Sequence, residues 1–223
     1  MDTFIQSLIN TLIRFVPLVL AVTLHEAAHG YAALKCGDDT ALKQGRITLN
    51  PFKHIDPVGT LLIPGVLLLI HAPILLGYAK PVPINFRNLR HPKRDIGAVA
   101  LAGPGMNFML MLVSAFTLKI MSLFGASAQT PLGDFLVSFL IINCFIGLFN
   151  LLPILPLDGG RVLWSFLPAT QADRFQRTEP YGMFLIFGAL LILPWLLGIN
   201  PLGWLLRTLN FGIINFCLKI FGL

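Results

Sequence analysis

The chain has 223 residues, of which 56% are hydrophobic and 12% are charged, and its formal net charge is +6. A soluble domain is about one quarter charged, so this composition indicates an integral membrane protein with no room for a sizeable soluble domain. Basic loops that orient membrane helices account for the positive charge, so we expect no nucleic-acid partner.

Five apolar runs have the length of membrane helices, because about 20 residues of helix span the hydrocarbon core. The runs predicted to cross are 15–34, 95–125, 133–153 and 181–198, and the last run, 201–223, is either a span or an interfacial helix. These runs predict a predominantly α-helical, polytopic bundle that forms one membrane domain over residues 1–223. The bilayer is therefore an expected partner.

The hydrophobic insert 57–79 follows the first span, and it either crosses the membrane or enters and returns. Prolines interrupt it at three positions, and segments 45–50 and 80–86 beside it have the β-branched character of short strands. If the insert is re-entrant, the basic loops that flank the spans share one face, and loops 126–132 and 198–203 opposite carry no basic residue. The positive-inside rule favours that arrangement, with the basic face in the cytoplasm.

The first span contains the sequence His25-Glu26-Ala27-Ala28-His29 inside an otherwise apolar run. Two histidines four residues apart lie on one face of a helix, one turn apart, and can bind the same zinc ion. Glu26 lies beside them and can act as a base, which is the H-E-x-x-H pattern of zinc proteases. Ionisable groups within a membrane span are costly and indicate a functional site.

A hydrolytic zinc site needs a third protein ligand. The candidates are His54, Asp56, His71 and Asp158, and Asp158 is favoured because it directly follows the third span in the sequence NLLPILPLDGGRVL. Gly159 and Gly160 allow a turn and a close approach there. The alternative for Asp158 is an N-cap of the next helix. Asp158 reaches the side of His25 and His29 only if 57–79 is re-entrant, so charge and ligand convergence favour the same topology.

These motifs together resemble the site-2 proteases, the intramembrane zinc metalloproteases. The resemblance rests on His25 to His29, on Gly103-Pro104-Gly105-Met106-Asn107, and on the element from Asn150 to Gly159. It implies one zinc ion held by His25, His29 and Asp158, with Glu26 as the base. It also implies a three-helix catalytic core within about 15–165, accessory helices at about 180–223, and a small membrane-associated β-sheet. The chain is similar to minimal prokaryotic members without a PDZ or CBS domain.

Further polar residues are candidates for substrate binding or support of the site. Asn150 and Asn107 are candidates for binding the substrate backbone or the oxyanion, and both have the alternative of hydrogen bonding between helices. His54 and Asp56 are candidates for hydrogen bonds to active-site groups, and their alternative is a polar turn held by its own side chains. Strands at 45–50 and 80–86 would hold an unwound substrate by β-augmentation.

The expected function is hydrolysis of peptide bonds within or near transmembrane segments of membrane proteins, in regulated intramembrane proteolysis or in clearance of signal-peptide remnants. The expected location is a prokaryotic cytoplasmic membrane, with the active site nearer the cytoplasmic face. The alternative is a zinc-binding membrane transporter or sensor without catalysis, which would use the histidines but has little use for Glu26.

Overall fold

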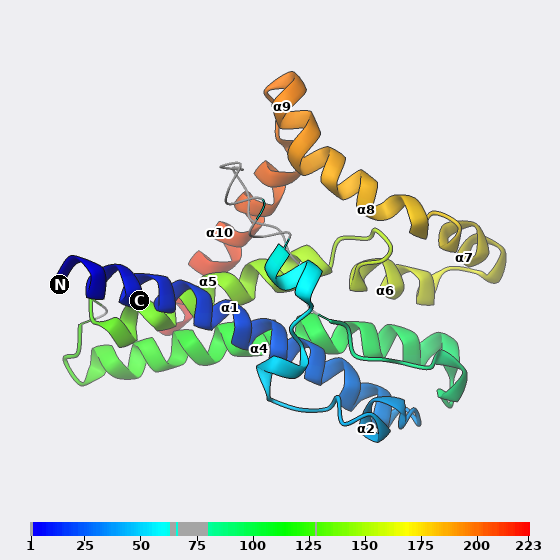
Figure 1. Cartoon of the computed structure of the whole chain (residues 1–223), viewed down its shortest axis with the longest axis horizontal. Helices are drawn as coiled ribbons and strands as arrows, with labels where there is room; N and C mark the ends of the chain where they lie inside the picture. Colours follow the sequence, from blue (N-terminus) through cyan, green and yellow to red (C-terminus); the bar gives the residue numbers. More distant parts are fainter. Residues whose placement is uncertain (1, 63–65, 67–79, 128) are drawn as a thin grey trace.

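The computed structural model describes residues 2–62, 66, 80–127 and 129–223 (Figure 1). Its long helices are α1 (Asp2–Lys35), α4 (Pro92–Leu123), α5 (Pro131–Asn150) and α10 (Pro201–Phe221). A bent helical arm joins α8 (Glu179–Phe187), η4 (Gly188–Ile192) and α9 (Leu193–Leu197). The shorter helices are α2 (Thr40–Lys43), η1 (Pro51–Lys53), η2 (Pro57–Leu62), η3 (Phe86–Asn88), α6 (Asp158–Phe166) and α7 (Ala169–Gln176).

Four helical segments within the described residues are long and apolar enough to cross a membrane: Pro92–Leu123, Pro131–Asn150, Glu179–Leu197 and Pro201–Phe221. They coincide with the predicted runs that begin near residues 95, 133, 181 and 201, and they confirm a helical membrane protein. The predicted first span, 15–34, lies inside α1, which starts at Asp2 and continues without a break through the histidine motif.

Helices α1, α4 and α5 pack against one another and form the centre of the molecule (Figure 1). Small buried residues such as Ala21, Ala33 and Gly103 allow their backbones to approach closely, as is usual between membrane helices. Helix α10 packs on α4 and α5 over an apolar cluster that includes Met111, Leu140 and Cys217. This packing therefore places α1, which carries the histidine motif, next to α5, the long helix that precedes Asp158.

The predicted β-sheet is wrong for the described chain, because residues 45–50 and 80–86 form no strand. Proline has no backbone N–H, so Pro81 and Pro83 deprive one segment of alternate ladder donors. In the other segment the Thr48 hydroxyl accepts from the Asn50 backbone, which turns the chain locally. The two segments are still joined, because the Arg46 guanidinium donates to the carbonyl oxygens of Lys80 (2.8 Å) and Pro81 (3.2 Å).

The predicted re-entrant insert lies mostly outside the described residues, as does His71. Its first part, Pro57–Leu62, is a π-helical turn. The chain on either side returns to the same end of α1, because the Arg90 N–H donates to the Cys36 carbonyl at 3.0 Å. Segment 37–89 therefore leaves and re-enters the same end of the helix bundle.

The arm formed by α8, η4 and α9 diverges from the three central helices (Figure 1). At its base α8 crosses the loop between α5 and α6, where Gly182 lies against the backbone of Leu155. A Cβ atom at position 182 would overlap the Leu155 carbonyl oxygen, so only glycine allows this crossing. Leu155 is three residues before Asp158, so the arm rests on the loop that leads into the candidate metal site.

Candidate metal centre

Helix α1 carries His25, Glu26 and His29, and the two histidines lie on the face that meets α4. Both rings are buried, and their Nε2 atoms are 3.0 Å apart with the ring planes 86° from one another. The four-residue spacing that the sequence predicts to place both rings on one face does so here. The space that they occupy exists because α4 has Gly103 at the point of contact.

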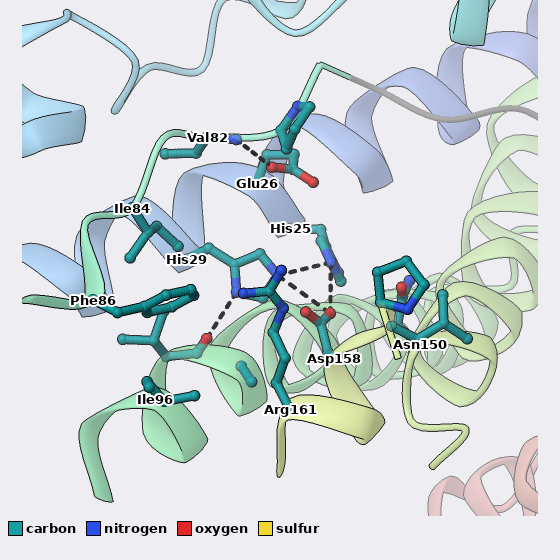
Figure 2. Close-up of a pocket in the computed structure, with 15 residues that line it drawn as sticks. His25, Glu26, His29, Val82, Ile84, Phe86, Ile96, Asn150, Asp158 and Arg161 are labelled. Atoms are coloured by element: carbon teal, nitrogen blue, oxygen red, sulfur yellow. Dashed lines mark hydrogen bonds and ion pairs between the residues drawn. The ribbon is translucent and has the colours of Figure 1, made fainter. Parts of the chain in front are cut away.

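Asp158 is the first residue of α6, and its carboxylate points toward the two histidines (Figure 2). Its Oδ2 atom lies 3.2 Å from Nε2 of His25 and 3.3 Å from Nε2 of His29. The residue at the N-cap position of α6 is Leu157, so the carboxylate is directed to the histidines rather than capping the helix. Gly159 and Gly160 are buried against the backbone of 151–155, which brings α6 close to the loop.

The geometry of these three side chains fits a zinc ion. Their ligand atoms all lie within 4.8 Å of one another, and the three separations between them are 3.0, 3.2 and 3.3 Å. Tetrahedral zinc with ligand bonds near 2.1 Å separates its ligand atoms by about 3.4 Å, so the triangle is close to that size. Oδ2 is also buried and accepts no well-oriented hydrogen bond, which is costly unless a cation compensates.

Hydrogen bonds on the far side of each ring present both Nε2 atoms as ligands. His29 Nδ1 is 2.7 Å from the Val99 carbonyl, which can only accept, so Nδ1 carries the proton. His25 Nδ1 donates to Asn107 Oδ1 at 2.6 Å. A neutral imidazole protonated at Nδ1 has its lone pair on Nε2, which is the form that binds a metal.

Asn107 is part of a buried chain of amides that the sequence analysis did not fully identify. Its Nδ2 donates to Asn143 Oδ1 at 2.9 Å and to the Ala21 carbonyl at 3.3 Å. Asn143 Nδ2 in turn donates to the Phe139 carbonyl at 2.8 Å. These bonds orient the Asn107 amide with its oxygen toward His25. Asn143 was missed, although a polar residue within an apolar span is itself a signal of function.

Asp158 is ionised at neutral pH. Burial by itself would raise the pKa of this carboxyl, but hydrogen bonds from His25 and His29, which need a proton on Nε2 when no metal is bound, favour the charged form more strongly and lower the pKa to about 2. A divalent cation would replace such a proton, and the charged carboxylate with the two imidazole nitrogens forms a donor set suited to it.

A pocket of about 320 Å³ opens beside the three side chains. One wall is formed by residues 80–88, which we call the strap, through Pro81, Val82, Ile84 and Phe86. Glu26 also lines the pocket, and its Oε2 accepts a hydrogen bond from the Val82 backbone at 2.9 Å (Figure 2). Arg161 of α6 borders the pocket and stacks on Phe86 at 5.0 Å.

The remaining predicted residues lie at different distances from the pocket. Asn150 lines it, and its side-chain nitrogen donates to the Ile146 carbonyl at 3.0 Å. Asn107 lies behind His25, and among the residues that the structure describes it is not one that lines the pocket. His54 and Asp56 are also absent from that lining: His54 Nε2 contacts the Thr48 carbonyl, and Asp56 accepts from backbone groups at the start of η2.

A buried carboxylate anchors the strap to the end of α1. Asp38 accepts hydrogen bonds from the backbone of Asn85 (2.7 Å), from the Asn88 amide (2.9 Å) and from the hydroxyl and backbone of Thr40. Burial by itself would raise the pKa of Asp38, but these hydrogen bonds outweigh burial and lower it. Because these hydrogen bonds are stronger to the charged form, their contribution to stability depends on pH.

We expect Asp38→Asn to lower the free energy of unfolding by about 1–3 kcal/mol, because the strap donors lose a buried charged acceptor. The folded-state pKa of Asp38 is depressed, so its stabilisation is complete above the unfolded value near 4 and is lost as pH falls through the folded value. Thermal unfolding of the purified protein between pH 3 and 7 measures both effects. The control is Asp39→Asn, which removes an exposed pair with Lys43 worth less than about 1 kcal/mol. Equal unfolding curves for the two variants would contradict the role of Asp38.

Comparison of the sequence with known proteins identifies a family. The family model for peptidase family M50 matches residues 115–193, which include Asn150 and Asp158. The chain is 39% identical over 183 residues to "Putative zinc metalloprotease YwhC" of Bacillus subtilis, which covers 80% of each protein. It is 28% identical over 178 residues to "Putative zinc metalloprotease Rip2" of Mycolicibacterium smegmatis, covering 79% of this chain and 65% of the relative.

A third relative is "Putative zinc metalloprotease Rip2" of Mycobacterium tuberculosis, 31% identical over 155 residues, 69% of this chain and 57% of the relative. No solved structure matches the chain at a significant level. The match to the Bacillus protein extends over most of both sequences, and the family model covers the segment that supplies Asp158. The chain therefore belongs to peptidase family M50, the site-2 protease family that its sequence motifs resemble.

Proposed function

We propose that this protein is an intramembrane zinc metalloprotease that hydrolyses peptide bonds within or near transmembrane segments of membrane proteins. The observation that carries the proposal is the triangle of His25, His29 and Asp158 with Glu26 beside it at the pocket. Membership of a peptidase family, the names of the relatives and four apolar helices support the same conclusion. A zinc transporter or sensor without catalysis is not favoured, because such a protein would have little use for Glu26 at the pocket.

In this proposal Nε2 of His25, Nε2 of His29 and Oδ2 of Asp158 would hold one zinc ion. When bound there, zinc would act as a Lewis acid, polarising the scissile carbonyl and activating a water molecule near neutral pH. Glu26 takes the proton of the attacking water and passes it to the leaving amine. The hydrogen bonds from His29 to Val99 and from His25 to Asn107 hold the two rings in the ligating orientation.

Other residues receive roles according to their position. Asn150 lines the pocket, so we assign it to the substrate backbone or the developing oxyanion. Asn107 is assigned to the orientation of His25, because its oxygen accepts from that ring. His54 supports the strap rather than the metal, since its carbonyl accepts from the Lys80 backbone at 2.9 Å. Asp56 is assigned to the turn that begins η2.

The membrane is proposed to be the cytoplasmic membrane of a prokaryote, with the site near its cytoplasmic face. The basic residues of loops 35–56, 80–94 and 159–179 support this orientation, because cytoplasmic loops carry an excess of lysine and arginine. The hydrogen bond between Arg90 and Cys36 supports a re-entrant path for 57–79, which brings these loops to one face. Substrates are then membrane proteins or the remnants of signal peptides.

Replacement of the base tests the proposal directly. Glu26→Gln keeps the size of the side chain and removes its ability to accept a proton, so we expect cleavage of a model transmembrane substrate to fall by about 10²–10⁴-fold. Zinc content should stay at the wild-type level, because Glu26 is not one of the three ligands. The measurements are cleavage by purified protein in detergent or liposomes and metal analysis of the same samples.

The matched control is Glu179→Gln, since Glu179 is the other glutamate of the chain and is absent from the described lining of the pocket. This variant should cleave at nearly the wild-type rate. Wild-type cleavage by Glu26→Gln would overturn the proposed mechanism, and so would a wild-type protein that binds no zinc.

A further inference from the structure

We infer that the strap positions the catalytic base, and that the backbone N–H of Val82 is the group that does so. The inference rests on the proposed function, because it takes Glu26 as the base. It adds a positioning residue that is 56 positions away from Glu26 in the sequence and belongs to no catalytic motif.

The contact is direct and engages one atom of the carboxylate. The Val82 N–H donates to Oε2 of Glu26 at 2.9 Å, a normal length for such a bond. Glu26 lines the pocket, and a carboxylate has a second oxygen that the strap does not engage. One oxygen is therefore held by the strap, and the other is left to receive a proton from water.

Two prolines of the strap isolate Val82 as a backbone donor. Its neighbours Pro81 and Pro83 have no N–H group, so Val82 carries the single backbone donor between Lys80 and Ile84. The same prolines that prevent a strand therefore leave one donor, and that donor is directed at Glu26.

Packing and hydrogen bonds hold Val82 in place. Its side chain lies over Gly30, one helical turn after Glu26 on the same face of α1, where an added Cβ would come within 3.0 Å of Val82 Cγ1. Arg46 binds the carbonyl oxygens of Lys80 and Pro81 on one side. Asp38 binds Asn85 and Asn88 on the other side. The strap is thus held on both sides of Val82, and the position of the Val82 N–H is fixed with it.

The consequence for catalysis follows from the freedom of a glutamate side chain. An unheld glutamate has several rotamers, and only some of them bring the carboxylate to the attacking water. A fixed donor on Oε2 selects one rotamer before the substrate arrives, which is the kind of preorganisation that raises kcat. Because Val82 N–H contacts Glu26 and not the metal ligands, the effect should fall on kcat alone.

The sharpest test replaces Val82 by 2-hydroxyisovaleric acid, which exchanges the N–H for an ester oxygen and keeps the side chain. We expect kcat for a model transmembrane substrate to fall by roughly ten- to a hundredfold, as for a lost hydrogen bond to a charged group, with KM and zinc content unchanged. Val82→Pro removes the same donor by ordinary mutagenesis. Val82→Ala keeps the donor and trims the packing, so its kcat should lie well above that of the ester.

A double variant distinguishes this inference from the proposed function. In the Glu26→Gln background the ester should cause no further loss, because the base it positions is gone. If the ester protein keeps the wild-type kcat while Glu26→Gln is inactive, the positioning role is overturned and the proposed function stands. A loss of zinc, or an equal change in KM, would also overturn it, since the strap would then act only on the fold. Cleavage by Glu26→Gln would instead overturn the proposed function itself.

Discussion

Gly103→Ala is expected to weaken zinc binding strongly and to lower peptide hydrolysis with it. A Cβ at this position would lie 2.6 Å from Nε2 of His25 and closer still to Nε2 of His29, inside van der Waals contact with both proposed ligands. The rings cannot move outward without breaking their bonds to Asn107 and Val99. Because zinc tolerates only small deviations in ligand position, we expect its affinity to fall by more than about a hundredfold.

The matched control is Gly105→Ala, two residues further along α4, where an added Cβ meets nothing within 4 Å. Both substitutions replace a helical glycine by alanine, so they change helix propensity by the same small amount, about 1 kcal/mol in favour of the helix. Metal competition with a coloured chelator and cleavage assays compare the two variants. If Gly103→Ala bound zinc as tightly as Gly105→Ala, the imidazole rings of His25 and His29 would not lie against Gly103, and the described packing of the site would be wrong.

Asp158→Ala is expected to cause a loss of similar size by a different route. Two imidazoles then remain, which is one ligand fewer than a hydrolytic zinc site needs. Zinc affinity should fall by more than about a hundredfold, and cleavage should fall with it. The metal-free protein should also lose some thermal stability, because the contacts of the carboxylate with His25 and His29 are lost.

Asp173→Ala is the control for this variant, since Asp173 is an exposed aspartate of the neighbouring helix α7. It should bind zinc as the wild type does. Zinc retention by Asp158→Ala would remove Asp158 from the ligand set and would direct attention to the other acidic and histidine residues of the loops. Metal analysis after dialysis against a weak chelator gives the answer for both variants.

Local patterns predicted the parts of this molecule that depend on local rules. The apolar runs predicted the long helices because helix length in a membrane follows from bilayer thickness. The four-residue spacing of His25 and His29 placed both rings on one face, since that relation is a property of the helix itself. The prolines before α6 and the glycines in its first turn indicated a close approach by Asp158, which the structure brings to both rings.

The parts that were missed depend on contacts between distant segments. The prediction of strands at 45–50 and 80–86 weighed β-branched residues and overlooked the missing donors of Pro81 and Pro83. The contact between Val82 and Glu26 joins two segments whose local sequences give no sign of each other. Asn143 reaches His25 only through Asn107, so its role depends on how α5 and α4 are aligned.

The apolar arm formed by α8, η4 and α9 contacts the rest of the protein close to the candidate metal site, where α8 crosses Leu155. The arm, Glu179–Leu197, is about 28 Å long at 1.5 Å per residue, and little of its surface is buried against the rest of the protein. Gly182 leaves no free space against the Leu155 carbonyl. A change in the tilt of the arm at Gly182 would therefore press on the loop that ends at Asp158.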